Sequence, residues 1–509
     1  MNRLLLSLTV AMFSITASAQ RYVVVNGDTP ILASDVEKIT YEVDDKFDQI
    51  LLPGVLALDP KTTIFSQALQ LTGLADTLKT YLYAHPDPSD EPKIKYQVAS
   101  NSRKETAWPF QRKFKNFTVF AETDDAFAEQ GITNLEQLKA YAKQVYDEAF
   151  PEDAGITDPK DRRNSLNRFV AYHILKHKST YWYLTVYNDI PYFSFQNTDL
   201  VDIAAWYGTL MPHASLKCSY PMAGEESGLY LNHRGLKDGP DKYGKQVRGA
   251  KVVADGEQGF DHECYNGCYF YIDSVLTYDQ TTRNEVLGSE LWRVDFKTLS
   301  PEIMSCAKDL RGDYDTNDCW CADQEGPNTG TGCNYYFRWD RMENVVGDTT
   351  KASKQLVASR AHAYWGSWQG DAIYIYGDFN MTIKLPALPA GEWEVRMGTT
   401  SLATRPNVRI YLNGKMTIDS LDMSKSYDET IPYTMRGPRE CFVAGKHSFA
   451  DISDMVRYRL GRIETDGKSD NYLRIELLPG ELGYDYWTQF DYFELVPKAV
   501  FDNQEIPEE

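Results

Sequence analysis

The sequence predicts an α+β protein, in which helices pack on a β-sandwich wedge and an all-β, jelly-roll-like sandwich follows. Two patterns predict this order. Before about residue 175, apolar residues recur several times at three- and four-residue steps, which is the spacing of an amphipathic helix. From about residue 355, apolar and polar residues mostly alternate, as in strands with one buried face. The aromatic fraction of 13%, with 34 Tyr and 10 Trp, also favours a β-rich chain.

The first residues have the three parts of a secretory signal peptide. The first three residues include an arginine, residues 4–15 are apolar, and Ala17-Ser18-Ala19 is an Ala-x-Ala cleavage site. The apolar run is shorter than the ~20 residues of a membrane span. We therefore expect cleavage after Ala19 and export to the periplasm, the outer cell surface or the medium. No later stretch predicts a transmembrane segment.

Length and charge limit the organisation and the classes of partner. A chain of 509 residues exceeds what one core usually fills, so we expect two domains. The 53 basic and 73 acidic residues give a net charge of −20. A strongly acidic surface repels phosphate groups, which disfavours nucleic acid and anionic lipid as partners.

An extension, helices and a strand are expected first. Residues 20–59 predict an N-terminal extension. From Thr62 to Leu78, apolar residues recur at helical spacing. Residues 116–129 predict strand, turn and helix, because β-forming residues are followed by Thr123, which stands two residues before an Ala/Phe segment, as an N-cap should.

Two more helices follow. Thr133 and Glu136 form a capping-box pattern before an amphipathic helix at residues 135–149. After a polar insert at residues 151–163, another helical pattern ends in Tyr172-His173-Ile174-Leu175. His173 is a candidate metal ligand or base, but a lone His without nearby Asp or Cys favours a packing role.

Three segments resemble the signatures of the fasciclin domain. The stretch from Thr118 to Phe127 resembles the first signature, with Glu122 where the family commonly has Pro. Tyr172-His173 followed by aliphatic residues matches the second, and Asn266-Gly267 before a strand ending in Asp-x-Val-Leu resembles the closing strand. The resemblance implies structural roles for these residues, with His173 bonded to the first signature. The signature residues are Thr118, Phe120, Thr123, Asp124, Phe127, Tyr172, His173 and Asp273.

This resemblance implies a fasciclin-like domain over residues 60–280. The span is longer than one such module needs, so insertions are expected at residues 151–163 and at about 190–260. Residues 281–354 are then expected to be a Cys-rich connector to the second domain.

The connector carries two candidate sites. An even count of eight cysteines in an exported chain permits disulfides, and four of them crowd into this stretch. An acidic run there has oxygen ligands at alternate positions, which suits calcium, although an EF-hand would need Gly and Glu in place of Asp318 and Gln324. A solvated loop held by disulfides is the alternative. The disulfide candidates are Cys306, Cys319, Cys321 and Cys333, and the calcium candidates are Asp313, Asp315 and Asn317.

Residues 355–498 predict a β-sandwich. Alternating strands surround Asn413-Gly414, which is a strong hairpin signal. A Leu-Pro-x-Gly turn before a Trp-containing strand, this hairpin and a terminal strand at 491–497 resemble galactose-binding-like sandwiches of bacterial exported proteins. Residues 499–509 are expected to form an acidic tail.

The function is expected to be binding. The sequence has no G-x-S-x-G, no H-E-x-x-H and no dinucleotide loop, so we expect a non-enzymatic protein without a cofactor, calcium apart. The first hypothesis is adhesion or scaffolding, with protein or glycan bound at the cell envelope. The alternative is carbohydrate capture for nutrient uptake, with a sugar site on the C-terminal sandwich. Its aromatic platform candidates, which fill strands more often than they bind sugars, are Tyr364, Trp365, Trp368 and Tyr374.

Overall fold

The computed structural model describes residues 22–23, 31–32, 45–80, 95–98, 103–106, 115–185, 203–220, 228–235, 240–241, 244–306, 334–339, 342–348, 350–351, 353, 355–360, 371–400, 405–424, 455–480 and 487–502. The chain divides into two compact units, Met1–Asp48 and Gln49–Glu509. In the first unit, β1 (Tyr22–Val23) pairs antiparallel with β2 (Ile31–Leu32). Helix α1 (Asp45–Ile50) crosses the boundary. The described chain is a mixed α/β protein with many strands and few helices.

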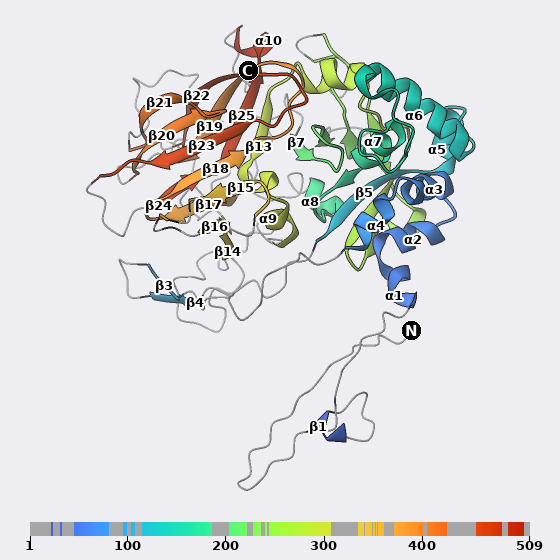
Figure 1. The fold of residues 1–509 in the computed structure, drawn as a ribbon, viewed down its shortest axis with the longest axis horizontal. Coiled ribbons are helices and arrows are strands. Elements are labelled where there is room, and N and C mark those ends of the chain that lie inside the picture. The colour runs from blue at the N-terminus through green and yellow to red at the C-terminus, as the bar shows by residue number, and fades with distance from the viewer. Residues whose placement is uncertain are drawn as a thin grey trace. The chain divides into compact units, whose positions relative to one another are not determined.

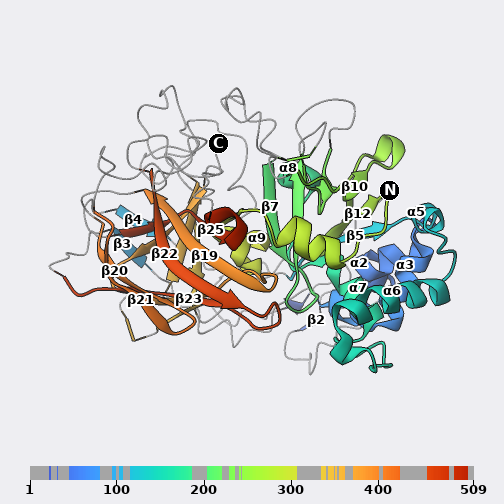
Figure 2. The same ribbon diagram turned by 90° about the horizontal axis from the view of Figure 1, so that it is seen from above.

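Six helices lie close together in the second unit (Figures 1 and 2). Their buried residues are mostly the apolar ones at helical spacing, and this confirms the helices expected over residues 62–78, 124–129 and 135–149. The helical pattern expected to run to Tyr172-His173-Ile174-Leu175 ends at Tyr172, with all eight residues of the helix buried, and Ile174–Leu175 form a strand instead. The helices are α2 (Leu52–Leu58), α3 (Thr63–Leu71), α4 (Leu74–Lys79), α5 (Asp124–Glu129), α6 (Leu135–Ala149) and α7 (Ser165–Tyr172).

The helix caps follow local chemistry, with one shift. Thr123 Oγ1 accepts a hydrogen bond from Ala126 N at 3.1 Å, so the predicted cap of α5 is confirmed. The predicted capping box of α6 is wrong by one residue. Asn134 is the cap, accepting from Gln137 N at 3.0 Å, and Gln137 Oε1 accepts from Thr133 N at 2.7 Å. Asn caps a helix as well as Thr does, and Gln137 takes the reaching-back role that was assigned to Glu136.

An eight-stranded sheet stands against these helices. The order β6-β5-β12-β10-β9-β8-β7 has β11 paired to β12, and the β5–β12 pair is parallel. Four of its strands come from residues 203–253, so much of the expected insertion is part of the sheet. The strands are β5 (Phe117–Glu122), β6 (Ile174–Leu175), β7 (Ile203–Gly208), β8 (Ser215–Tyr220), β9 (Tyr230–Leu231), β10 (Ala250–Val253), β11 (His262–Cys264) and β12 (Gly267–Ile272). Outside this sheet, β3 (Lys95–Val98) pairs with β4 (Arg103–Thr106).

The C-terminal half, which is called the sandwich below, is built from three antiparallel sheets (Figure 2). Their orders are β13-β25-β19-β22, β14-β16-β17-β24 and β15-β18-β23-β20-β21. The strands are β13 (Trp292–Asp295), β14 (Asn334–Arg338), β15 (Val345–Gly347), β16 (Gln355–Arg360), β17 (Asp371–Tyr376), β18 (Asn380–Lys384), β19 (Gly391–Thr400), β20 (Asn407–Leu412), β21 (Lys415–Asp422), β22 (Met455–Thr465), β23 (Tyr472–Leu477), β24 (Trp487–Phe490) and β25 (Tyr492–Pro497).

Two expected boundaries differ from the structure. The span 281–354 supplies β13, β14 and β15, one edge strand to each of the three sheets, because their backbone groups pair with later strands. The expected tail at 499–509 begins inside helix α10 (Lys498–Phe501), where Val500 and Phe501 are buried against Val496. The hairpin at Asn413-Gly414 is confirmed, with φ of 48° and 78° between β20 and β21.

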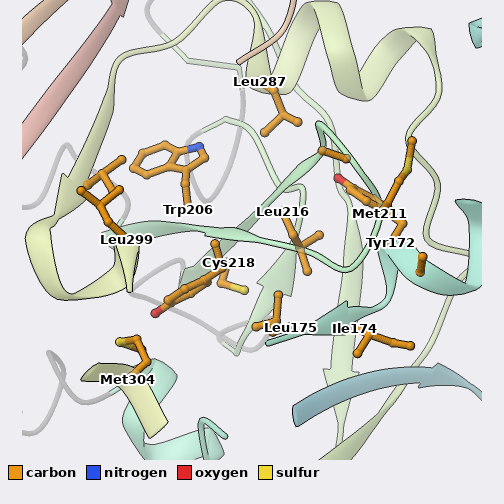
Figure 3. Packing of buried hydrophobic residues seen from close by; sticks show 14 of the residues in the cluster. Tyr172, Ile174, Leu175, Trp206, Met211, Leu216, Cys218, Leu287, Leu299 and Met304 are labelled. Atoms are coloured by element: carbon orange, nitrogen blue, oxygen red, sulfur yellow. The ribbon is translucent and has the colours of Figure 1, made fainter. Parts of the chain in front are cut away.

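Stacked tryptophans join the eight-stranded sheet to the sandwich. The rings of Trp206 in β7 and Trp292 in β13 stack with centroids 5.7 Å apart, and Trp292 meets Trp393 of β19 edge-on at 5.6 Å. One hydrophobic cluster runs through both halves, and Figure 3 shows part of it around Trp206 and Leu216. The second unit therefore has a continuous core.

A buried ion network ties four strands of the first sandwich sheet. Glu494 of β25 is fully buried, and Arg293 Nε donates to its Oε1 at 3.1 Å. Arg457 Nε lies 2.9 Å and Arg396 Nη1 3.7 Å from its Oε2. The three arginines stand on β13, β22 and β19, so one carboxylate serves three neighbouring strands.

The start of the parallel β5–β12 pair requires a glycine. A Cβ on Gly267 would lie 2.2 Å from Phe117 O and 2.8 Å from Leu52 Cδ1. The neighbouring Asn266 side chain accepts from Leu52 N at 2.9 Å and donates to Leu78 O at 2.5 Å, which pins α2 and α4 to this point.

Gly267→Ala should therefore destabilise the second unit. We expect a loss of about 1–3 kcal/mol or more in unfolding free energy, because overpacking forces the backbone apart. Gly155→Ala is the control, since a Cβ there meets nothing within 4 Å. Urea unfolding followed by tryptophan fluorescence measures both, and equal midpoints for the two variants would contradict this account.

Candidate functional site

The strongest polar contact among the signature residues is a buried pair of Glu122 and His173. Both side chains are 0% exposed, and His173 Nε2 lies 2.7 Å from Glu122 Oε1. The other ring nitrogen, Nδ1, lies 2.7 Å from Phe169 O. Leu276 N donates to the same Glu122 oxygen at 3.0 Å. The pair thus joins the ends of β5 and α7 to the segment that follows β12.

This buried pair has a structural role, because its hydrogen bonds hold neighbouring segments together. A carbonyl oxygen only accepts, so His173 Nδ1 carries a proton that it donates to Phe169 O. The other ring nitrogen, Nε2, faces the Glu122 carboxylate, so both nitrogens of the buried ring have a partner. With both side chains closed off from solvent, neither can reach a ligand. His173 does bond to the first signature, as the resemblance implies, and Glu122 is its partner.

The remaining signature residues also make internal contacts. Asp124 Oδ1 accepts from Ile64 N at 3.0 Å, and its Oδ2 accepts from Thr63 Oγ1, so it caps α3. Thr118 Oγ1 donates to His177 O at 2.7 Å. The other contacts, in one list, are Phe120 with Phe270, Phe127 with Phe169, Tyr172 with Ser215 O and Asn232, and Asp273 with Arg248.

Asp273 shows how such a carboxylate is held. Burial alone would raise the pKa of Asp273, but the hydrogen bonds from Arg248 and from Lys251 N outweigh burial and leave the pKa below its ordinary value. The Arg248 guanidinium lies 2.6 Å from Asp273 Oδ2 and also stands over the Tyr230 ring. Asp273 therefore anchors the strands beside it.

Most other predicted site residues lie outside the described residues. These are Tyr364, Trp365, Trp368, Asp313, Asp315, Asn317, Cys319, Cys321, Cys333 and the side chain of Cys306. Tyr374 is described in β17 and is 8% exposed, so it offers little ring surface to a sugar. Cys218, Cys264 and Cys268 are described and are free thiols.

A pocket of about 330 Å³ opens where the eight-stranded sheet meets the sandwich. Its walls are the segment after β6, the end of β7 with the β7–β8 loop, residues 298–301, Asn344, the segment from Lys384 to Ala387, and Asp470. Ser215 Oγ donates to Ala387 O at 2.9 Å beside it, which binds the two walls together. Its volume is that of a small-ligand site.

The polar groups of this pocket converge on Asp470. Lys384 Nζ lies 2.9 Å from Asp470 Oδ2, and His213 Nδ1 lies 3.3 Å from Oδ1. Burial would raise the pKa of Asp470, but the hydrogen bond and charge of Lys384, with the charge of His213, hold it below its ordinary value. The carboxylate is therefore ionised at neutral pH.

Backbone geometry presents His213 to this carboxylate. His213 has φ of 55°, a left-handed conformation that costs free energy in a residue with a side chain. The loop is closed by Thr209, whose N and Oγ1 both donate to Ala214 O, at 3.2 and 3.0 Å. Strain retained at a pocket is a recognised sign of function.

The other wall has a buried Ser–His contact that is not a nucleophile for the pocket. His177 lines the pocket, and its Nδ1 lies 2.9 Å from Ser179 Oγ. Ser179 is 1% exposed and does not line the pocket, so its hydroxyl cannot meet a ligand there. Nearby Lys176 pairs with Glu343 at 2.6 Å.

Sequence reasoning missed the whole pocket. Its residues come from segments up to some 290 positions apart, and none belongs to a motif. The one available signal was Pro212-His213 inside the expected insertion at about 190–260, where a Pro followed by a polar residue is typical of a turn.

Comparison with known proteins yields only weak structural likeness. No family model matches the sequence, and no curated protein is similar to it. A FAS1 domain pair from the insect cell adhesion molecule fasciclin I is 14% identical, with a TM-score of 0.17, over 32% of this chain and 36% of that one. A family 35 carbohydrate binding module from Clostridium thermocellum is 12% identical, with a TM-score of 0.17, over 32% and 96%. The TM-scores are low, and these likenesses carry no argument about function.

Among the described residues, no group of three or more His, Cys, Asp and Glu side chains is placed to hold a metal ion. Nor does any helix found there have the length and apolar character needed to span a membrane.

Removing the carboxylate of the buried pair should destabilise the protein. We expect Glu122→Ala to lower the unfolding free energy by about 3–5 kcal/mol, because His173 and Leu276 N lose their partner in a buried place. Glu122→Gln, which keeps an oxygen for Leu276 N, should lose less. Glu136→Ala is the control, since its exposed pair with Lys139 is worth about 1 kcal/mol or less. Urea unfolding measures the unfolding free energy of all three variants. A loss in Glu122→Ala no larger than that in Glu136→Ala would refute the structural role of the pair.

Proposed function

We propose that this protein is an exported, non-enzymatic binding protein of the cell envelope that holds a glycan in the pocket beside Asp470. The observation that carries the proposal is the pocket itself, with polar groups on an otherwise apolar wall. Lys384 and His213 are already oriented by Asp470, so hydrogen-bond donors stand ready without rearrangement. Trp206 of the wall stacks on Trp292, and this contact keeps the two halves together.

Adhesion or scaffolding is the role that best suits this site. The pocket is open at the surface, and its walls come from both halves of one continuous core. A force on a bound ligand is therefore carried by the packed core and not by a single loop. No pairing of a nucleophile with a base faces the pocket among the described residues, since Ser179 lies behind His177. A binding role needs no such pair.

Carbohydrate capture for nutrient uptake is the second candidate. One wall of the pocket belongs to the sandwich, namely Lys384 to Ala387 and Asp470, which agrees with a sugar site on that part of the chain. Free short oligosaccharides would bind as well as polymer if capture is the role. An adhesin would instead require polymer on a surface, because many weak contacts then act together.

Filling the pocket should abolish glycan binding without unfolding the protein. Gly208 lines the pocket, and a Cβ there meets nothing within 4 Å, so a side chain can leave the backbone at this position without a clash. We expect Gly208→Trp to weaken binding on an array of immobilised oligosaccharides by about tenfold or more, since the ring takes the ligand's volume. Gly155→Trp, also in open space but away from the pocket, should bind normally. An array with no bound glycan, or equal binding by the two variants, would sink the proposal.

A further inference from the structure

We infer that the pocket beside Asp470 takes a saccharide that carries a carboxylate, such as a uronate-containing oligosaccharide. This inference rests on the proposed glycan-binding function and names the chemical class of its ligand. It comes from the basic side chains that line the pocket, from what Asp470 is already bonded to, and from the groups that remain for a ligand.

The lining of the pocket is richer in basic side chains than the chain as a whole. The whole sequence has 73 acidic against 53 basic residues. Among the described residues that line the pocket, two are lysines, two are histidines and one is an aspartate. Each lysine pairs with one carboxylate, Lys384 with Asp470 and Lys176 with Glu343, so the wall is balanced in charge but rich in hydrogen-bond donors. A wall of cationic donors favours a ligand with an anionic acceptor over a cation.

The one carboxylate in the wall is occupied. Asp470 Oδ2 accepts from Lys384 Nζ at 2.9 Å and from Tyr472 OH at 3.4 Å, while Oδ1 faces His213 Nδ1 at 3.3 Å. The carboxylate of Asp470 therefore orients Lys384 and His213. It is poorly placed to accept sugar hydroxyls, so the wall mainly offers donors.

The remaining donors suit a planar anion. An ammonium group has three N–H donors, and Lys384 and Lys176 each use one in the described contacts with Asp470 and Glu343. His213 Nε2 has no hydrogen bond to the part of the chain that the structure describes. Lys384 and His213 meet at Asp470 and Lys176 lines the same pocket, so their remaining donors are the groups that would bind the oxygens of a carboxylate. Charge-assisted bonds of this kind are the strong ones.

The saccharide part of the inference comes from the rest of the wall. Pro212 and Pro386 flank the polar groups and Asn344 adds an amide, so the lining alternates apolar faces with hydrogen-bonding groups. A sugar ring has the same alternation of C–H faces and hydroxyl edges. A bare inorganic anion would leave most of the 330 Å³ unfilled.

The test compares each acidic sugar with its own neutral ester. Oligosaccharides of galacturonate, glucuronate and mannuronate, and their methyl esters, are titrated by calorimetry into the full-length protein, with a sulfated galactose oligosaccharide as a further arm. We expect at least one acid to bind about tenfold more tightly than its ester at low salt, because the ester keeps the shape and removes the charge. The difference should shrink between about 0.05 M and about 0.5 M salt, since exposed charges are screened.

Three matched variants locate the charge. Lys384→Gln and Lys176→Gln should each weaken binding of that acid by about fivefold or more and weaken ester binding by a smaller factor, because the acid loses a charge-assisted bond and the ester at most a neutral one. Lys415→Gln, on the exposed start of β21 and outside the pocket, should change neither. Thermal unfolding checks that all three fold.

Each outcome decides a separate question. Esters that bind as tightly as acids, with binding lost in Gly208→Trp, would overturn the carboxylate inference and leave the glycan-binding proposal standing. A sulfated sugar preferred over every uronate would overturn it as well. If no saccharide binds, the proposed function fails with it. An acid preference unchanged in Lys384→Gln and Lys176→Gln would place the anion elsewhere and refute the assignment to this pocket.

Discussion

The helical end of the second unit depends on burying a carboxylate and an imidazole together. Glu122 and His173 are both inaccessible to water, and each would be costly to bury alone. Because Phe169 O and Leu276 N complete their hydrogen bonds, three segments distant in sequence have to arrive in one arrangement. Glu122 is the last residue of β5, so this contact also fixes the end of the parallel β5–β12 pair, which begins at Gly267.

The same core extends past the sheet and supports the pocket. Trp206 stacks on Trp292, which meets Trp393, so the wall that carries the β7–β8 loop is packed on the sandwich. The loop residue His213 and the sandwich residue Asp470 face each other across this contact. A surface loop alone would not keep His213 in this position. The pocket therefore depends on the contact between the eight-stranded sheet and the sandwich.

Regular elements could be predicted from the sequence better than the site could. Helical periodicity gave α3 to α7, and Asn413-Gly414 gave the β20–β21 hairpin, because these depend on neighbours in the chain. The cap of α6 was misplaced by one residue since two good capping residues stand side by side. No local rule pairs Glu122 with His173 or brings Lys384 to Asp470, because such contacts cross long stretches of chain and depend on packing.

The ion network of the first sandwich sheet has a consequence for the order of folding. Arg293 and Glu494 are 201 positions apart, and β13 has its only ladder partner in β25 among the described strands. The arginines of β13, β19 and β22 all lie against Glu494 of β25, so this set of contacts is complete only when β25 has joined the sheet. Contacts so distant in sequence form slowly. The sheet β13-β25-β19-β22 therefore joins segments from residue 292 to residue 497, and a large part of its stability depends on contacts of long sequence separation.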